Sequence, residues 1–367
     1  MTIHADDAHF LRLAFVRGVG SIAAHKLLSE LRDISAVFDA STATLSHIVG
    51  DAIARKISAV PDAETQVKIN EALAWLQREP DHHLLTWAHP SYPKALLESG
   101  DAPLVIYAKG RIELLTRRAI AMVGSRNCSQ GGADTAEAFA QAFAERGVTV
   151  VSGMALGIDA ASHVGALRAK GNDCGSTIAV IGTGIDRVYP ARNKVLAHSI
   201  AEQGLMLSEY PMGTPPLPAN FPKRNRIISG LSMGVLVVEA SMASGSLITA
   251  RFAGEQGREV FAIPGSIHST FHKGCHHLIK QGAKLVETAN DVLEELRFET
   301  VTQSVEAVSE NSAATGLLKF MEHTPIDVDA LVARSGLAVD QVVTELTMLE
   351  LDGRIEPLPG GCWQRRG

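Results

Sequence analysis

The stretch VTVVSGMALGIDAASHVGALRAKG (residues 148–171) changes its pattern twice along its length. It opens with a β-branched apolar run, passes through glycines and small residues, and continues as an alanine-rich segment with helical spacing. A continuous apolar run suits a strand that is covered on both faces of its sheet. Gly153 and Gly157 permit a sharp turn directly after that strand. The stretch therefore predicts a strand, a tight turn and a helix.

The same unit recurs from about residue 105 to about residue 290. Apolar runs that end in glycine or small polar residues occupy residues 119–124, 148–153, 177–182, 205–210, 234–240, 259–265 and 284–287. Strands that alternate with helical stretches form parallel sheets. We therefore predict an α/β fold with a central Rossmann-like, doubly wound parallel sheet. Ligands of such sheets bind at the carboxyl ends of the strands, near the reversal of strand order.

Two different patterns flank this region. The first 75 or so residues have helical spacing interrupted by Gly18-Val19-Gly20, which predicts a helical domain of the helix-hairpin-helix or SAM-like kind. Its turn either grips a DNA backbone with its amides or serves only for packing. After residue 312, three short helices and a glycine-containing β-turn predict a winged helix. We expect a helical domain (1–80), a Rossmann-like domain (81–298), a polar linker (299–312) and a winged-helix domain (313–367).

The third helix of the expected winged helix carries acids and no cation. Its acidic residues are Asp340, Glu345, Glu350 and Asp352. A helix that reads DNA bases normally presents Arg, Lys, Asn or Gln. This composition favours protein contact over DNA reading, although both remain open.

Composition limits the location and the partners of the chain. It has 367 residues, a formal net charge of -6 and four cysteines without a CxxC pair. There is no run of about 18 uncharged apolar residues, and the N-terminus has acids where a signal peptide carries cations. We therefore expect a cytoplasmic protein with reduced thiols and no membrane association. Because the net charge is negative, any binding of a polyanion requires a local basic patch.

The segment FPKRNR provides such a patch. Lys223, Arg224 and Arg226 lie within four positions, directly after a loop that is rich in proline. We expect the proline-rich loop to hold the three cations against the sheet edge, where their charges converge on one strip.

Three strand ends could contribute backbone donors to the same strip. They are residues 123–127, 152–159 and 243–246, and each places small residues where a helix begins. Free N–H groups and the helix dipole at such positions favour a phosphate. None of the three matches a strict dinucleotide or P-loop motif, so each alone could be a simple turn. Together with the basic segment they predict binding to a phosphate backbone.

Other candidates carry less weight. Asp159 and His163 are four residues apart on one predicted helix, so they form either an acid–base pair or, for Asp159, a helix N-terminal cap. The segment HSTFHKGCHH (residues 268–277) is predicted to be a solvated loop, although its role is open. We expect no catalytic group, no metal site and no cofactor.

Three strings make a family recognisable. They are VSGMALGIDAASHVGAL, AVIGTGIDRVYPARN and the long segment from SEYPMGTPPLPANFPKRNRIISG to GREVFAIPG. They resemble the DNA-processing protein A (DprA/Smf) family, over residues 84–295. The resemblance implies a non-catalytic protein that binds single-stranded DNA, protects incoming strands in natural transformation and helps to load the RecA recombinase. It also implies a homodimer formed through the Rossmann-like domain, but no residue of the dimer or RecA contacts stands out.

We predict the following DNA-binding residues: Ser125, Arg126, Gly153, Gly157, Phe221, Lys223, Arg224, Asn225, Arg226, Ser244, Gly245 and Ser246. Phe221 either stacks on a base or anchors its loop in the core. The chain departs from the family at His276, where many members have asparagine.

Two alternatives remain. Nucleotide N-glycoside hydrolases have a similar fold and a PGGxGTxxE-like motif, but the matching stretch here, EASMASGSLITARFAGE, lacks the double glycine. The nearest acid, Glu255, comes six residues after Thr249. The second alternative is a recombination adaptor that acts mainly by protein contacts.

Overall fold

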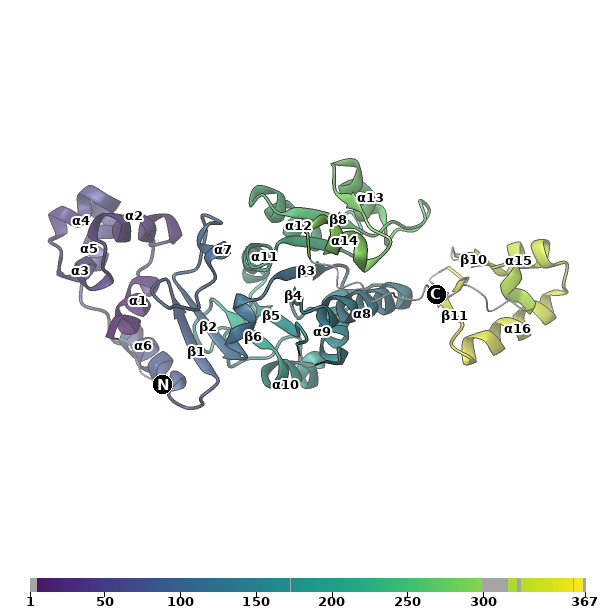
Figure 1. Ribbon diagram of the computed structural model, residues 1–367, viewed down its shortest axis with the longest axis horizontal. Helices are drawn as coiled ribbons and strands as arrows, with labels where there is room; N and C mark the ends of the chain where they lie inside the picture. The colour runs from purple at the N-terminus through teal and green to yellow at the C-terminus, as the bar shows by residue number, and fades with distance from the viewer. Residues whose placement is uncertain (1–4, 172, 299–315, 322–324, 359, 366–367) are drawn as a thin grey trace.

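A computed structural model of the chain describes residues 5–171, 173–298, 316–321, 325–358 and 360–365. Helices lie at one end of the molecule, a large sheet covered by helices lies in the middle, and a small domain lies at the other end (Figure 1). The predicted linker, residues 299–312, falls outside the described residues.

The N-terminal part is helical, as predicted. Its helices are α1 (Ala5–Phe15), α2 (Ser21–Leu31), α3 (Ile34–Asp39), α4 (Thr42–Val49), α5 (Asp51–Ser58) and α6 (Ala63–Leu76). The turn between α1 and α2 contains Gly18 at φ +105°, a conformation that favours glycine. Lys56 of α5 donates to the Arg17 carbonyl of this turn at 2.9 Å. The turn is therefore tied to the opposite hairpin of its own domain.

The described residues contain one sheet of nine strands. The strands are β1 (His82–Thr86), β2 (Val105–Gly110), β3 (Ala119–Val123), β4 (Thr149–Ser152), β5 (Thr177–Ile181), β6 (Leu205–Ser208), β7 (Gly234–Val237), β8 (Glu259–Ala262) and β9 (Lys284–Leu285). Their order is β1-β2-β6-β5-β4-β3-β7-β8-β9. The seven strands from β3 to β9 pair in parallel and coincide with the seven apolar runs, which confirms the doubly wound parallel sheet.

The first two strands pair antiparallel and extend one edge of the sheet. They were not among the predicted strands. HHLLT, the sequence of β1, does not alternate between polar and apolar residues, yet four of its five residues are buried. Leu84 packs with the N-terminal helices, whereas Leu85 packs in the cluster of Tyr92 and Leu96. Pairing with β2 and contacts on both faces, which the local pattern does not reveal, hold this strand.

Helices cover both faces of the sheet (Figure 1). Apolar residues of α11, α12 and α13 pack with the strands in one cluster, and those of α8, α9 and α14 pack in another. The helices and 3-10 turns of this domain are α7 (Lys94–Leu97), η1 (Ile112–Thr116), α8 (Gln130–Glu145), α9 (Ile158–Arg168), η2 (Ala191–Asn193), α10 (Lys194–Gln203), α11 (Asn220–Gly230), α12 (Ser246–Glu255), α13 (Lys273–Lys280) and α14 (Ala289–Glu295).

Strand order reverses beside β3, which lies between β4 and β7. The chain moves from β3 outward to β6 and then returns across the sheet to β7. The loops that follow β3, β4 and β7 therefore meet at one edge, where ligands of such sheets bind. These are the same three strand-end loops that the sequence analysis singled out.

Two segments for which the sequence predicted no helix contain one. FPKRNR lies in the first turns of α11, where Pro222 is tolerated because early helical N–H groups have no intrahelical acceptor. Residues 273–277 of the histidine-rich segment open α13, so the loop prediction is wrong there. Cys275 is fully buried against the sheet. This burial stabilises a helix that the local sequence pattern does not predict.

The C-terminal domain consists of η3 (Gly316–Lys319), β10 (Ile326–Asp327), α15 (Val328–Ser335), α16 (Val339–Leu351), β11 (Ile355–Leu358) and β12 (Cys362–Arg365). Its strands form a small sheet in the order β10-β12-β11. This is the predicted winged-helix pattern, with a 3-10 turn at the first helical position. Across the described parts of the chain, every helix is too short or too polar to cross a bilayer.

Candidate functional site

A polar cavity of about 550 Å³ opens at the carboxyl ends of β3, β4 and β7. The loops after these strands and the first turns of α11 and α12 form its walls. Eight of the twelve predicted site residues line it: Ser125, Arg126, Phe221, Arg224, Asn225, Ser244, Gly245 and Ser246. Because the order of parallel strands brings these loops together, residues more than a hundred positions apart share one cavity.

Glycines allow two of the loops to pack backbone against backbone. Ser125 N–H donates to the Glu239 carbonyl at 2.7 Å, and Ile158 N–H donates to the Ser125 carbonyl at 3.2 Å. Gly157 has φ +76°, and a Cβ there would lie 2.3 Å from the Ser125 oxygen. Gly157 itself does not line the cavity. It supports the cavity indirectly, because its small size lets the Ser125–Arg126 backbone pack against it.

Arg224 lies beneath the cavity with only 4% of its surface exposed. Its Nη1 donates to the Gly153 carbonyl at 2.6 Å and also to the Val180 carbonyl, while Nε donates to Asn225 Oδ1 at 3.2 Å. Burial lowers the pKa of Arg224 to about 10, and the charge of Asp159 opposes that shift. The guanidinium thus links the ends of β4 and β5 and places a cation under the cavity floor.

Asp159 faces the same floor. A Cβ at Gly153 would lie 2.7 Å from both Arg224 Nη2 and Asp159 Oδ2, so the two side chains flank this glycine. Burial raises the pKa of Asp159, whereas the charge of Arg224 lowers it. Asp159 Oδ2 accepts from Ala155 N–H at 3.3 Å, so the carboxyl group binds an amide of the turn before its helix. This contact agrees with the helix N-terminal role, one of the two that the sequence left open for Asp159.

His163 does not pair with Asp159. Its side chain is fully buried, and Nδ1 lies 2.7 Å from Thr177 Oγ1. The second ring nitrogen, Nε2, has no hydrogen-bond partner among the described residues. Burial, assisted by the positive charge of Arg224, lowers the pKa of His163 to about 3.

Acid is expected to destabilise the protein through His163. A histidine whose folded pKa lies below its unfolded value of 6.5 contributes stability above pH 6.5, and this stability is lost as the pH falls toward 3. The linkage amounts to about 2 kcal/mol between pH 6.5 and pH 5. Urea unfolding of His163→Gln at pH 7 and pH 5 should show a smaller difference than wild type. His47→Gln, at an exposed histidine, should keep the wild-type difference, and an unchanged difference in His163→Gln would contradict the assignment.

Arg126 and Phe221 form one side of the cavity mouth. Arg126 is exposed, forms no salt bridge with a described acid, and lies over the Phe221 ring at 5.9 Å from its centroid. The other side of the ring packs on Gly182, where a Cβ would be 2.9 Å away, and the Tyr189 ring lies 5.5 Å from it. Phe221 is therefore anchored on its inner side and half-exposed on the cavity side.

The N-terminus of α12 forms another part of the cavity wall. Ser244 Oγ and Ser246 Oγ are 2.7 Å apart, and the open space around Gly245 leaves its backbone accessible. The positive end of the helix dipole points toward the cavity, together with these hydroxyl groups. Such a helix start binds an anion favourably.

Lys223 and Arg226 lie elsewhere. Both line a separate groove of about 480 Å³ between α11 and the N-terminal helices. The expectation that three cations converge on one strip is therefore wrong. An α-helix turns by about 100° per residue, so Arg224 faces the cavity while Lys223 and Arg226, three apart, share another face.

Several cavity residues were not predicted. Asn127, Tyr189, Ser241 and Thr249 line the cavity beside the predicted ones. Tyr189 precedes a proline in a turn and lacks any local sign of a ligand role, so only the fold reveals it. A larger hollow of about 890 Å³ beside α2 is mainly apolar and offers less to a phosphate. Within the described residues, no three His, Cys, Asp or Glu side chains are placed to hold a metal ion.

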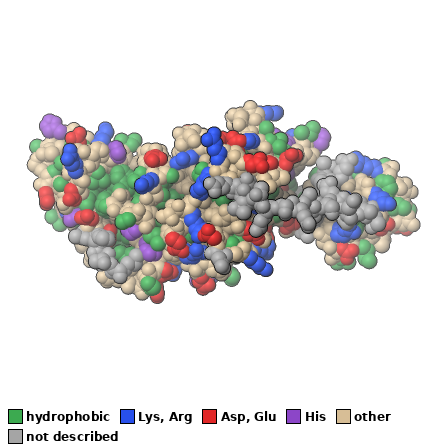
Figure 2. Space-filling view, in the orientation of Figure 1, with side chains coloured by type: hydrophobic (Ala, Val, Ile, Leu, Met, Phe, Trp, Pro, Cys, Tyr) green, Lys and Arg blue, Asp and Glu red, His purple; other side chains and the backbone are tan. Residues whose placement is uncertain are grey.

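The surface shows why a local site is needed. Lys and Arg side chains are interspersed with Asp and Glu over the face shown in Figure 2, without one continuous basic band. In contrast, the described lining of the cavity contains Arg126 and Arg224 but one carboxyl group, the buried Asp159. The cavity therefore attracts an anion although the chain as a whole is acidic.

Comparisons with known proteins show which family this chain belongs to. Residues 83–297 match the family model of DNA recombination-mediator protein A, and residues 302–361 match that of the DprA winged helix domain. Protein Smf of Escherichia coli is 44% identical over 305 residues, which cover 80% of each chain. The X-ray structure of DNA processing protein A from Streptococcus pneumoniae aligns with a TM-score of 0.67 and 39% identity, over 81% of this chain and 100% of the other.

A second solved structure has a title that names a ligand. DNA processing protein A from Helicobacter pylori aligns with a TM-score of 0.52 and 29% identity, over 59% of this chain and 96% of the other. That structure is described as giving insights into a single-stranded DNA binding mode. The resemblance inferred from the three sequence strings is confirmed, and the chain belongs to the DNA recombination-mediator protein A (DprA) family.

Proposed function

We propose that this protein binds single-stranded DNA in the cavity at the carboxyl ends of β3, β4 and β7. The observation that carries the proposal is that Arg126 and the N-terminus of α12 line one cavity, with the buried cation of Arg224 beneath. A phosphate between them meets a guanidinium, two serine hydroxyl groups and the positive end of a helix dipole. The Helicobacter pylori relative, described by its single-stranded DNA binding mode, supports the same ligand.

The shape of the cavity favours single strands. A cavity of about 550 Å³ accommodates a few bases and phosphates of an unpaired strand. In a duplex, by contrast, the bases are covered and the backbone is stiff. Phe221 and Tyr189 present rings at the mouth, where an unstacked base can lie on an aromatic face. Since these contacts address phosphates and ring faces, binding depends strongly on salt and little on sequence.

In this proposal the protein acts in competence and DNA recombination, in the cytoplasm. It protects incoming strands during natural transformation, helps to load RecA and works as a homodimer through the Rossmann-like domain. It does so without catalysis. Glu255, the acid that a nucleotide hydrolase of this fold would need near its phosphate loop, is the last residue of α12, about 13 Å along the helix from Ser246.

A second candidate is a recombination adaptor that acts by protein contacts. The observation that favours it is the outer face of α16, where Val339, Val343, Met348 and Leu351 are exposed among acids. Glu345, by contrast, is used inside the domain, where it accepts from Leu317 N–H at 2.9 Å. An adaptor of this kind needs no DNA cavity, so the two candidates differ in the titration that follows.

The proposal is tested by titrating a labelled dT oligonucleotide, and the matching duplex, at several salt concentrations. We expect wild type to prefer the single strand. Arg126→Ala should bind more weakly, and the salt slope of log K should fall by about 0.7, the contribution of one phosphate contact on a single strand. Arg146→Ala, at an exposed arginine at the far end of α8, is the matched control.

Two results would refute the DNA cavity. One is the absence of single-strand binding by wild type at low salt, which would leave the adaptor. The other is equal affinity and equal slope for wild type and Arg126→Ala, which would place any DNA contact outside this cavity.

A further inference from the structure

Helix α11 separates two hollows. Phe221, Arg224, Asn225 and Ile228 face the DNA cavity, whereas Lys223 and Arg226 face the groove toward the N-terminal helices. Any group that fixes the far face of this helix also fixes the near face, because a helix moves as a rigid unit. Contacts on the groove side of α11 therefore affect the placement of the side chains that line the cavity.

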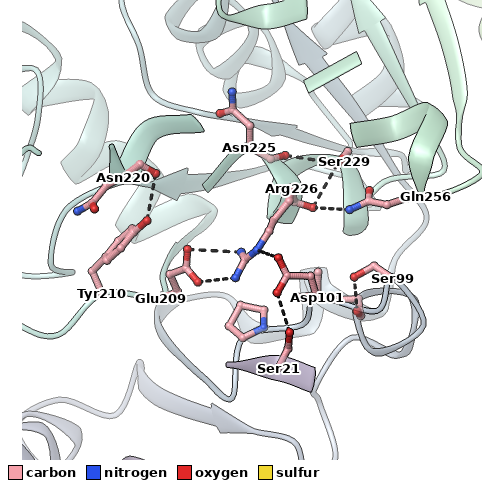
Figure 3. Close-up of polar contacts among 12 residues, drawn as sticks. Ser21, Ser99, Asp101, Glu209, Tyr210, Asn220, Asn225, Arg226, Ser229 and Gln256 are labelled. Atoms are coloured by element: carbon pink, nitrogen blue, oxygen red, sulfur yellow. Dashed lines mark hydrogen bonds and ion pairs between the residues drawn. The ribbon is translucent and has the colours of Figure 1, made fainter. Parts of the chain in front are cut away.

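Arg226 makes most of these contacts (Figure 3). Its Nη2 and Nη1 donate to the two carboxyl oxygens of Glu209 at 2.7 and 3.4 Å, and its Nε donates to Asp101 Oδ2 at 2.8 Å. The Arg226 side chain is only 13% exposed. Burial alone would lower the pKa of Arg226, but the charges of Glu209 and Asp101 outweigh it, so the pKa is raised.

The same contacts extend into the N-terminal domain. Asp101, in the loop before β2, accepts from Ser21 Oγ at 2.7 Å through its other oxygen. Ser21 is the first residue of α2, so its hydroxyl belongs to the helical domain. A continuous polar chain thus runs from α11 through Asp101 to the helical domain (Figure 3).

Two further side chains bind backbone carbonyls of α11. Gln256 Nε2, just after α12, donates to the Arg226 carbonyl at 3.0 Å. Tyr210, in the loop after β6, donates from its hydroxyl to the Asn220 carbonyl at the start of α11, also at 3.0 Å. The helix is therefore held along its length by residues of the β6 loop and of the α12 region.

This geometry does not suit direct contact between Arg226 and DNA. Each of the three guanidinium nitrogens already donates to a carboxyl group. A phosphate approaching this side would meet two carboxyl groups for one cation, and repulsion between like charges would oppose it. Charged pairs shielded from water are also screened less by salt than exposed ones.

We propose that Arg226 is a positioning residue that joins the helical domain to the DNA cavity: through Glu209 and Asp101 it fixes the placement of α11, and through Asp101 and Ser21 it docks the helical domain. The effect on DNA binding rests on the proposed function, whereas the joint between the domains does not.

The test uses the full-length variants Arg226→Met, Arg226→Lys and Ser21→Ala. Amide hydrogen exchange is measured over residues 15–31 and 205–231, and the dT titration is repeated at several salt concentrations.

Arg226→Met should exchange faster in both segments and bind about tenfold more weakly at every salt concentration, with the wild-type slope. Arg226→Lys keeps the charge and should lie between wild type and Arg226→Met, because one ammonium cannot serve both carboxyl groups as a planar fork does. Ser21→Ala should exchange faster over residues 15–31 only and bind DNA within about twofold of wild type.

Three results would overturn the proposal. A slope reduced by about 0.7 in Arg226→Met, as expected for Arg126→Ala, would make Arg226 a phosphate ligand. Unchanged exchange over residues 15–31 in both Arg226→Met and Ser21→Ala would exclude the joint. Wild-type affinity in Arg226→Met would exclude positioning. If wild type fails to bind DNA, the proposed function falls, and the exchange data still decide whether the joint exists.

Discussion

Arg224→Met is expected to lower the free energy of unfolding by about 3 kcal/mol and to abolish single-strand binding. The change leaves the carbonyls of Gly153 and Val180 without their donor and removes the main cation beside the buried Asp159. Buried carbonyls and charges that lose their partners incur the full cost of their desolvation. The measurements are urea unfolding at pH 7 and the dT titration under native conditions.

A rescue variant separates the two causes. Adding Asp159→Asn to Arg224→Met removes the uncompensated carboxyl group, so stability should rise by more than about 1 kcal/mol relative to the single variant. DNA affinity should stay low, because the cation under the cavity floor is still missing. Lys223→Met, at the exposed neighbouring cation, should change stability by less than about 0.5 kcal/mol. If Arg224→Met is as stable as Lys223→Met, the buried contacts of Arg224 have been assigned the wrong role.

Gly157→Ala is expected to destabilise the protein by about 2 to 4 kcal/mol and to weaken DNA binding. Its Cβ would lie 2.3 Å from the Ser125 oxygen and 2.7 Å from the Arg126 oxygen, at a φ of +76°. Either the loop after β3 moves or the left-handed turn is lost. Since Arg126 stands on that loop, a change behind the cavity displaces a side chain at its mouth. Thermal unfolding and the dT titration measure the two effects.

A second glycine serves as the control. Gly254 lies near the end of α12, is exposed, and has no atom within 4 Å of the position that a Cβ would take. Gly254→Ala should therefore stabilise the protein by about 0.5 kcal/mol and leave DNA binding unchanged. Equal effects of the two substitutions would show that the close approach at Gly157 has no special importance.

These predictions assign different roles to neighbouring cations. Arg126 acts from the cavity mouth, Arg224 acts from below the floor, and Arg226 acts from the far side of α11. A salt titration distinguishes them, because only a residue that pairs with a phosphate alters the salt slope.

The parallel sheet and the edge at which the cavity lies could be predicted from the residues alone. Seven apolar runs separated by helical stretches are enough for this, because parallel strands with helical crossovers place all their carboxyl ends on one side. The loops at Ser125, Gly157 and Ser244 follow such strands, so they could be predicted to meet without knowledge of any contact. Two of the three family strings contain the loops at Gly157 and Ser244.

The role of each cation of FPKRNR, by contrast, depends on the folded arrangement of the chain. Helical phase separated Arg224 from Lys223 and Arg226, and the segment carries no local sign that it is helical. The partners of Arg226, Asp101 and Glu209, come from 125 and 17 residues away. The antiparallel strand β1 is likewise held by its pairing with β2 and by packing on both faces, on one of them against the N-terminal helices. Residue type determines which interactions a side chain can make, but its direction and its distant partners exist only once the chain is folded.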